Sequence, residues 1–131
     1  MNRDTLVAKL RSELHNVLAV YAFGSRIQGV AGADSDLDLA VLVAGYADPQ
    51  TLWALTGNLA DLAGCPVDLL DLRSASTVMQ YQIVTQGRRW WARDSQAALY
   101  EAAILSEKTE LDTARAGLLD DIQKRGSVYG R

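Results

Sequence analysis

Residues 24–38 read GSRIQGVAGADSDLD and lie between two apolar runs, LAVYAF at 18–23 and LDLAVLV at 37–43. Short, continuous apolar runs bounded by turn residues predict buried strands. Because side chains alternate along a strand, Asp36 and Asp38 should share one face, while Leu37 and Leu39 point into the core. Two carboxylates about 7 Å apart on one face repel each other. We therefore expect a divalent metal ion to offset this repulsion.

Composition limits the class of protein. The chain has 131 residues, 49% of them hydrophobic, and a formal net charge of −3. This length and hydrophobic content are enough for one globular domain with its own core. The negative net charge is evidence against a nucleic-acid-binding module. The single Cys65 excludes an intramolecular disulfide and fits a reducing compartment. With no signal-peptide pattern and no apolar run of the ~20 residues that span a bilayer, we expect a cytoplasmic protein without a membrane partner.

The Gly24-Ser25 turn follows directly on the first apolar run. Glycine permits close approach to the backbone, Ser25 adds a hydroxyl group, and the N–H groups of such a turn can cradle phosphate oxygens. The turn is neither a Walker A loop nor a dinucleotide-binding glycine fingerprint. Arg26 fits two interpretations equally, a phosphate contact or an ordinary loop arginine.

A third acid lies in the apolar run PVDLLDL at 66–72. Asp68 is costly there unless it has a partner. If this run forms a strand beside 37–43, Asp68 can join Asp36 and Asp38 on one face; the alternative is a solvated carboxylate at a sheet edge. Asp71 has the opposite parity and is interpreted as a turn or cap residue.

The other elements follow from periodicity and cap residues. We predict a first helix, capped by Asp4 or Thr5, that ends near Leu14, and a second over about 50–63 opened by Pro49. A third helix is expected over about 77–85, capped by Ser74 or Ser76, and a short edge strand over 88–91. From Ser95 to about Lys124 the pattern is helical.

The spacing of these motifs resembles a known superfamily. Gly24-Ser25, ten residues, Asp36-Leu37-Asp38 and a later Asp68 are similar to the nucleotidyltransferases of the DNA polymerase β type. The ten-residue spacer and short chain resemble the minimal nucleotidyltransferase (MNT) family, typically encoded beside HEPN-domain proteins as antitoxins. The resemblance implies an α/β (α+β) fold, in which helices pack on a mixed β-sheet. Residues 1–94 would be the nucleotidyltransferase core of a single domain, and 95–131 a C-terminal helical segment that packs on the core or contacts a partner.

The resemblance also implies a chemistry. Asp36, Asp38 and Asp68 would be catalytic and would hold Mg²⁺, with two ions expected, while Gly24, Ser25 and Arg26 would bind the phosphates of ATP. A nucleophile would attack the α-phosphorus and pyrophosphate would leave. Asp68 would lie nearest the nucleophile, as a ligand and as its proton acceptor.

The acceptor is expected to come from a partner, because only about forty residues follow the last predicted strand. The resemblance implies a cognate HEPN-domain RNase toxin, bound in a hetero-oligomer and modified with AMP on a tyrosine, without direct contact of this chain to nucleic acid. Two alternatives stay open. The chain could neutralise the toxin by occlusion without catalysis, or it could be an antibiotic-type nucleotidyltransferase that modifies a small molecule.

Overall fold

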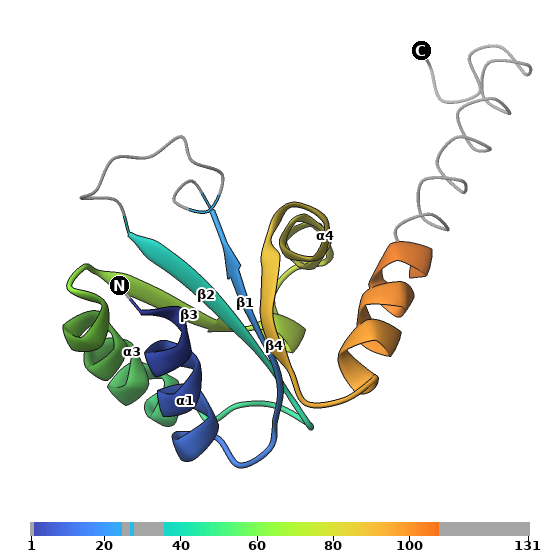
Figure 1. Cartoon of the computed structure of the whole chain (residues 1–131). Helices are drawn as coiled ribbons and strands as arrows, with labels where there is room; N and C mark the ends of the chain where they lie inside the picture. The colour runs from blue at the N-terminus through green and yellow to red at the C-terminus, as the bar shows by residue number, and fades with distance from the viewer. Residues whose placement is uncertain (1, 25–26, 28–35, 108–131) are drawn as a thin grey trace, which may run out of the picture.

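The computed structural model describes residues 2–24, 27 and 36–107, and its centre is a four-stranded sheet (Figure 1). The strands lie in the order β3-β2-β1-β4. Their bounds are β1 Val17–Phe23, β2 Leu37–Val43, β3 Val67–Asp71 and β4 Arg88–Ala92. β2 pairs with β1 antiparallel and with β3 parallel, and β4 pairs antiparallel with β1. The predicted mixed sheet is confirmed, including the third strand beside the second and the short strand at the edge.

Helices cover both faces of this sheet (Figure 1). The helices are α1 Arg3–Glu13, α3 Pro49–Ala63, the short 3-10 helix η1 Leu72–Ser74 and α4 Thr77–Gln86, and residues 96–107 are also helical. α1 and α3 pack on one face, and α4 and helix 96–107 lie on the other. In the described part of the chain, no helix is long and apolar enough to cross a membrane.

The helix caps agree with the predicted boundaries except at the first helix. Asn2, rather than Asp4 or Thr5, caps α1, because its Oδ1 accepts a hydrogen bond from Asp4 N at 2.9 Å. The carboxylate of Asp48 caps α3 one residue before Pro49, and Ser76 caps α4. Each side chain satisfies a backbone N–H group that the first helical turn leaves unpaired.

Alternation along β2 decides which side chains meet which helices. Leu37, Leu39 and Val41 are fully buried against the α1 and α3 layer. The residues between them face the other layer, where Ala40 and Leu42 join the core beneath α4. Asp38 shares the parity of Ala40, so its carboxylate lies on the α4 face of the sheet.

Helix 96–107 is joined to the sheet by a buried tyrosine. The hydroxyl of Tyr21, on β1, donates a hydrogen bond to Glu101 Oε2 at 2.7 Å. Arg89 on β4 donates to the same oxygen at 2.8 Å. Ala97 and Ile104 of this helix are buried. The predicted helical residues beyond 107 lie outside the described part of the chain.

Candidate active site

Gly24 directly follows β1 and lies against a carboxylate. Its φ of +85° is in the left-handed region, where residues with a Cβ are disfavoured. A Cβ at this position would also collide with Asp38 Oδ2, so a larger residue would displace the Asp38 carboxylate in addition to straining the backbone. The turn therefore brings the backbone at Gly24 into direct proximity with the side chain of Asp38.

Two of the predicted acids are neighbours across the parallel strands. Asp38 on β2 and Asp68 on β3 are register partners. Facing residues of neighbouring parallel strands point to the same side of the sheet, so both carboxylates lie on the α4 face. Asp36 is exposed and immediately precedes β2. The structure therefore brings Gly24, Asp38 and Asp68 together at one end of the sheet, with Asp36 close by.

The electrostatics reflect this crowding of negative charge. Burial raises the pKa of Asp38 above its usual range, and repulsion from Asp68 and then from Asp36 raises it further. Both neighbouring carboxylates thus act on Asp38 through space. A bound cation would favour the ionised form of Asp38 and reverse this effect.

The donor set fits a cation that is shared with a substrate. Among the described residues, no three His, Cys, Asp or Glu side chains converge closely enough to hold a metal ion by themselves. Mg²⁺ prefers hard oxygen ligands and is often held by one or two carboxylates together with substrate phosphates. The paired carboxylates of Asp38 and Asp68 match that arrangement.

Two predicted phosphate-binding residues, Ser25 and Arg26, lie outside the described residues. Asp71, interpreted as a turn or cap residue, is confirmed in that role. It is buried, caps η1, and accepts hydrogen bonds from Ala47 N at 2.9 Å and Arg73 N at 3.1 Å. Its carboxylate therefore joins the β2–α3 connection to the end of β3 and contributes no free ligand to the site.

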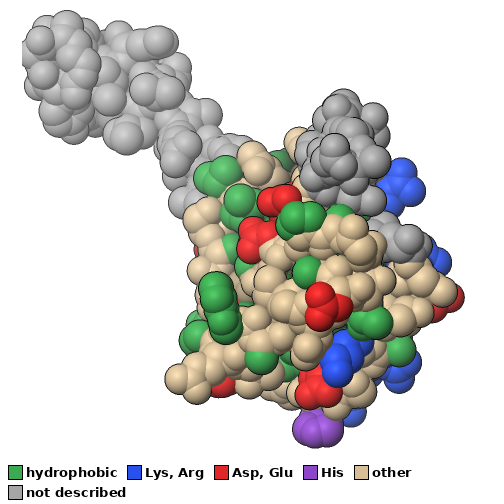
Figure 2. Space-filling view, turned by 90° about the vertical axis from the view of Figure 1, so that its left-hand side faces the viewer, with side chains coloured by type: hydrophobic (Ala, Val, Ile, Leu, Met, Phe, Trp, Pro, Cys, Tyr) green, Lys and Arg blue, Asp and Glu red, His purple; other side chains and the backbone are tan. Residues whose placement is uncertain are grey.

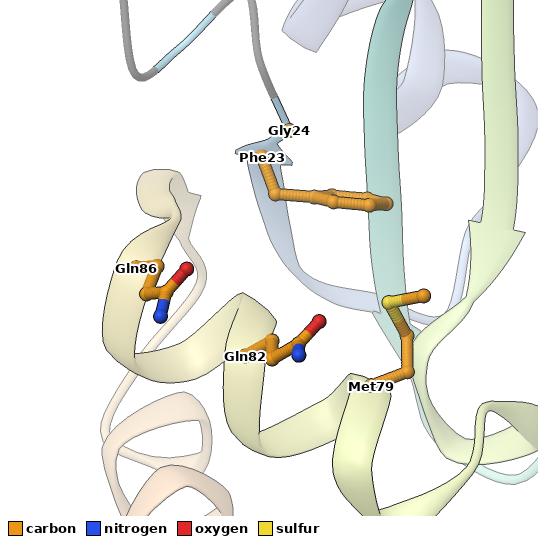
Figure 3. Close-up of a pocket in the computed structure, with 5 residues that line it drawn as sticks. All are labelled: Phe23, Gly24, Met79, Gln82 and Gln86. Carbon is orange, nitrogen blue, oxygen red and sulfur yellow. The ribbon is translucent and has the colours of Figure 1, made fainter.

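A cavity that sequence reasoning missed adjoins the carboxylates. It has a volume of about 310 Å³ and is lined by Phe23, Gly24, Met79, Gln82 and Gln86 (Figure 3). Two signals could have indicated it: the aromatic residue directly before the Gly-Ser turn, and the two glutamines spaced i, i+4 on α4. Their meeting depends on how α4 crosses the sheet, which the local sequence does not specify.

The chain is similar in sequence and in fold to known proteins. The family "Polymerase beta, Nucleotidyltransferase" matches residues 5–96. The protein adenylyltransferase MntA of Shewanella oneidensis is 36% identical over 122 residues, which cover 93% of this chain and 88% of that protein. The spectinomycin adenyltransferase AAD(9), crystallised with ATP and spectinomycin, has a TM-score of 0.52 at 18% identity over 70% of this chain and 56% of its own, and this shows a shared fold alone.

Two solved complexes are similar over almost the whole chain. A chain of a toxin–antitoxin crystal structure with AMP-PNP has a TM-score of 0.79 at 36% identity, covering 94% of this chain and 99% of its own. A chain from the complex of a tri-AMPylated Shewanella oneidensis HEPN toxin with its MNT antitoxin has a TM-score of 0.72 at 33% identity, covering 92% and 95%. This chain therefore belongs to the polymerase β nucleotidyltransferase family, and MntA is among its relatives.

Proposed function

We propose that this protein is an antitoxin that transfers AMP from ATP to a tyrosine of a cognate HEPN-domain RNase toxin. The observation that carries the proposal is the similarity, over more than nine-tenths of the chain, to an adenylyltransferase and to chains of toxin–antitoxin complexes, one of which contains a tri-AMPylated HEPN toxin. The paired carboxylates of Asp38 and Asp68 beside Gly24 supply the local chemistry that this transfer needs.

We assign the groups of the site as follows. Asp36, Asp38 and Asp68 hold Mg²⁺, with two ions expected, and Gly24, Ser25 and Arg26 hold the phosphates. When bound, Mg²⁺ neutralises charge on the attacking and leaving oxygens of an in-line displacement. Burial is the largest cause of the raised pKa of Asp38, and repulsion from Asp68 and Asp36 adds to it; this repulsion supports the assignment of the three acids to a cation.

The transfer itself is a single displacement at phosphorus. The tyrosine oxygen of the toxin forms a bond to the α-phosphorus, the bond from that phosphorus to the bridging oxygen breaks, and pyrophosphate leaves. A tyrosine hydroxyl has a pKa of about 10, so its proton must be accepted as the bond forms. We assign this role to the exposed carboxylate of Asp68.

The partner supplies the acceptor and completes the active complex. The toxin tyrosine would enter from the α4 face, where the carboxylates lie. We propose that the C-terminal segment 95–131 contributes to the contact, because helix 96–107 exposes Leu99 and Leu105. Bulky, charged AMP on a tyrosine near the RNase centre would exclude RNA. We place the reaction in the cytoplasm.

The proposal is tested by following which phosphorus atom of labelled ATP is transferred to the toxin. The purified toxin is incubated with Mg²⁺, this chain and ATP labelled at either the α- or the γ-phosphorus. We expect the toxin to acquire the α-label only, and Asp38→Asn to abolish labelling while Asp61→Asn, an exposed change on α3, leaves it intact. Neutralisation of the toxin by wild type and Asp38→Asn alike, without label, would instead support occlusion.

A further inference from the structure

The cavity between β1 and α4 touches the active site but contains none of its carboxylates. Gly24 forms part of its wall and also lies against Asp38. Phe23, on the same wall, is the register partner of Asp38 across β1 and β2. Whatever occupies this cavity is therefore within reach of a phosphate chain held at Asp38.

The size and walls of the cavity suit a flat, apolar ring. Its volume of about 310 Å³ is at the low end of the ~300–1,000 Å³ range of ligand pockets, so it fits part of a nucleotide rather than a whole one. The ring of Phe23 extends from β1 and the side chain of Met79 rises toward it from α4 (Figure 3). An aromatic face and a polarizable thioether are both favourable neighbours for a nucleobase.

The floor of the cavity presents carboxamide groups. Gln82 and Gln86 lie one turn apart on α4, and both are exposed (Figure 3). Gln80, on another face of the helix, instead makes hydrogen bonds within the protein. It donates to Ala75 O at 2.8 Å and accepts a hydrogen bond from the Tyr100 hydroxyl at 3.0 Å. A glutamine carboxamide matches adenine, which offers a donor at N6 beside an acceptor at N7, whereas guanine offers two acceptors there.

We propose that this cavity binds the adenine base of the nucleotide and selects ATP over the other nucleoside triphosphates. The base lies between Phe23 and Met79, and Gln82 reads its N6/N7 edge. This inference rests on the proposed function, because it takes the triphosphate to be held at Gly24 and Asp38. Gln82 is then the residue that determines base specificity.

Binding to the full-length chain tests the assignment. Affinities for ATP, GTP, CTP, UTP and inorganic tripolyphosphate are measured calorimetrically with Mg²⁺ for wild type, Gln82→Ala and Gln50→Ala. Gln50 is an exposed glutamine on α3, at the opposite face of the sheet. We expect Gln82→Ala to reduce the preference for ATP over GTP about tenfold, since each lost 1.4 kcal/mol is a factor of ten, while tripolyphosphate affinity stays unchanged. Gln50→Ala should behave as wild type.

Phe23→Leu supplies a second variant, with thermal unfolding as the check on folding. It should weaken all four nucleotides by a similar factor and leave tripolyphosphate unaffected, because stacking depends little on base identity.

Three results would overturn the assignment, and they separate it from the proposed function. Equal affinity of wild type for all four nucleotides, with AMP transfer intact, would refute the base site alone. An unchanged ATP affinity of Gln82→Ala, with a raised KM for the toxin, would show that the cavity receives the acceptor instead. Absence of ATP binding by the wild-type protein would refute both the base site and the proposed transfer.

Discussion

At the scale of single residues, Asp38 is electrostatically unfavourable in its ionised form, because it is partly buried and lies near two other carboxylates. It is the register partner of Asp68 on the neighbouring strand β3, and it lies near Asp36. Burial and then each of these two carboxylates raise its pKa. A raised carboxyl pKa means that the folded protein binds this proton more tightly than the unfolded chain does. Relative to a neutral side chain, Asp38 therefore lowers stability at every pH at which it is ionised.

We accordingly predict that Asp38→Asn stabilises the metal-free protein while it abolishes transfer. In the presence of EDTA at pH 7, the variant should unfold at a higher temperature than wild type. The difference should shrink as the pH falls through the raised pKa of Asp38 and vanish below the pKa of about 3.9 of an unfolded Asp, where both side chains are neutral. Thermal unfolding from pH 3 to 8 measures this, with Asp61→Asn as the matched control. A destabilised Asp38→Asn at pH 7 would contradict the account.

Gly24 and Gly45 form a natural pair for a second prediction. Both have φ of +85°, but a Cβ would meet the Asp38 carboxylate at Gly24 and nothing within 4 Å at Gly45. Gly45→Ala should lower the free energy of unfolding by about 1–2 kcal/mol, because a residue with a Cβ is disfavoured in the left-handed conformation. Gly24→Ala should cost more and should also abolish transfer, because the Asp38 carboxylate must move. Chemical denaturation and the transfer assay measure both effects, and equal behaviour of the two variants would show that the close approach is unimportant.

At the scale of elements, the partly buried hydrogen bond between Tyr21 of β1 and Glu101 of helix 96–107 makes a measurable contribution to stability. Burial and then the Glu101 carboxylate raise the pKa of the Tyr21 hydroxyl well above its ordinary value. Tyr21→Phe should lower the free energy of unfolding by about 1.5–3 kcal/mol, the usual range for a hydrogen bond to a charged group. Tyr46→Phe is the control, because Tyr46 is 71% exposed and should change stability by less than about 0.5 kcal/mol.

Tyr21 should also make the stability of the fold depend on pH above about pH 10. Above pH 10 the unfolded chain releases the Tyr21 proton, whereas the folded protein retains it, so wild type loses stability as the pH rises. Tyr21→Phe lacks this contribution, and its deficit should narrow between pH 10 and 12. A deficit that stays constant over this range in denaturant titrations would place Tyr21 in a more solvated site.

The elements also show how far sequence reasoning extends. The strands around residues 24–38, helix α3 with its Pro49 start, and Asp71 as a cap residue were all predictable, because each depends on local periodicity or on a local hydrogen bond. The cap at Asn2 was missed because Asn, Asp and Thr are all acceptable there and only the backbone geometry decides. The sequence predicts that Asp38 and Asp68 share a face only if the strand over 66–72 lies beside the strand over 37–43. The structure confirms that these strands are neighbours and that the two acids are register partners.

At the scale of the whole molecule, the layers explain why the carboxylates are available to a partner. α1 and α3 cover one face of the sheet, while α4 and helix 96–107 leave the ends of β2 and β3 accessible on the other. On the face shown in Figure 2, acidic side chains are scattered, and the coloured Lys and Arg side chains form no continuous stripe. The residues that line the cavity beside the site carry local sequence signals, but their meeting depends on how α4 crosses the sheet near β1, which the local sequence does not specify.

The arrangement of carboxylates also predicts how Mg²⁺ binds. Since no three acidic groups of the described residues converge on one point, Mg²⁺ alone should bind weakly and raise the melting temperature little. Mg²⁺ with a non-hydrolysable ATP analogue should raise it by several degrees, because a ligand at 100 times its Kd adds about 2.7 kcal/mol. Asp68→Asn should remove most of this shift. Full stabilisation by micromolar Mg²⁺ without nucleotide would mean that the protein alone completes the metal site.

The intact mass of the toxin shows directly whether this protein transfers AMP to it. The cognate HEPN protein is incubated with ATP, Mg²⁺ and either this chain or its Asp36→Ala/Asp38→Ala form, and its mass is then measured. We expect a gain of one AMP group or a whole multiple of it with wild type, and none with the double variant, because the variant lacks two of the carboxylates assigned to the metal ions. An unmodified toxin that both forms neutralise equally would refute AMP transfer and leave occlusion as the function.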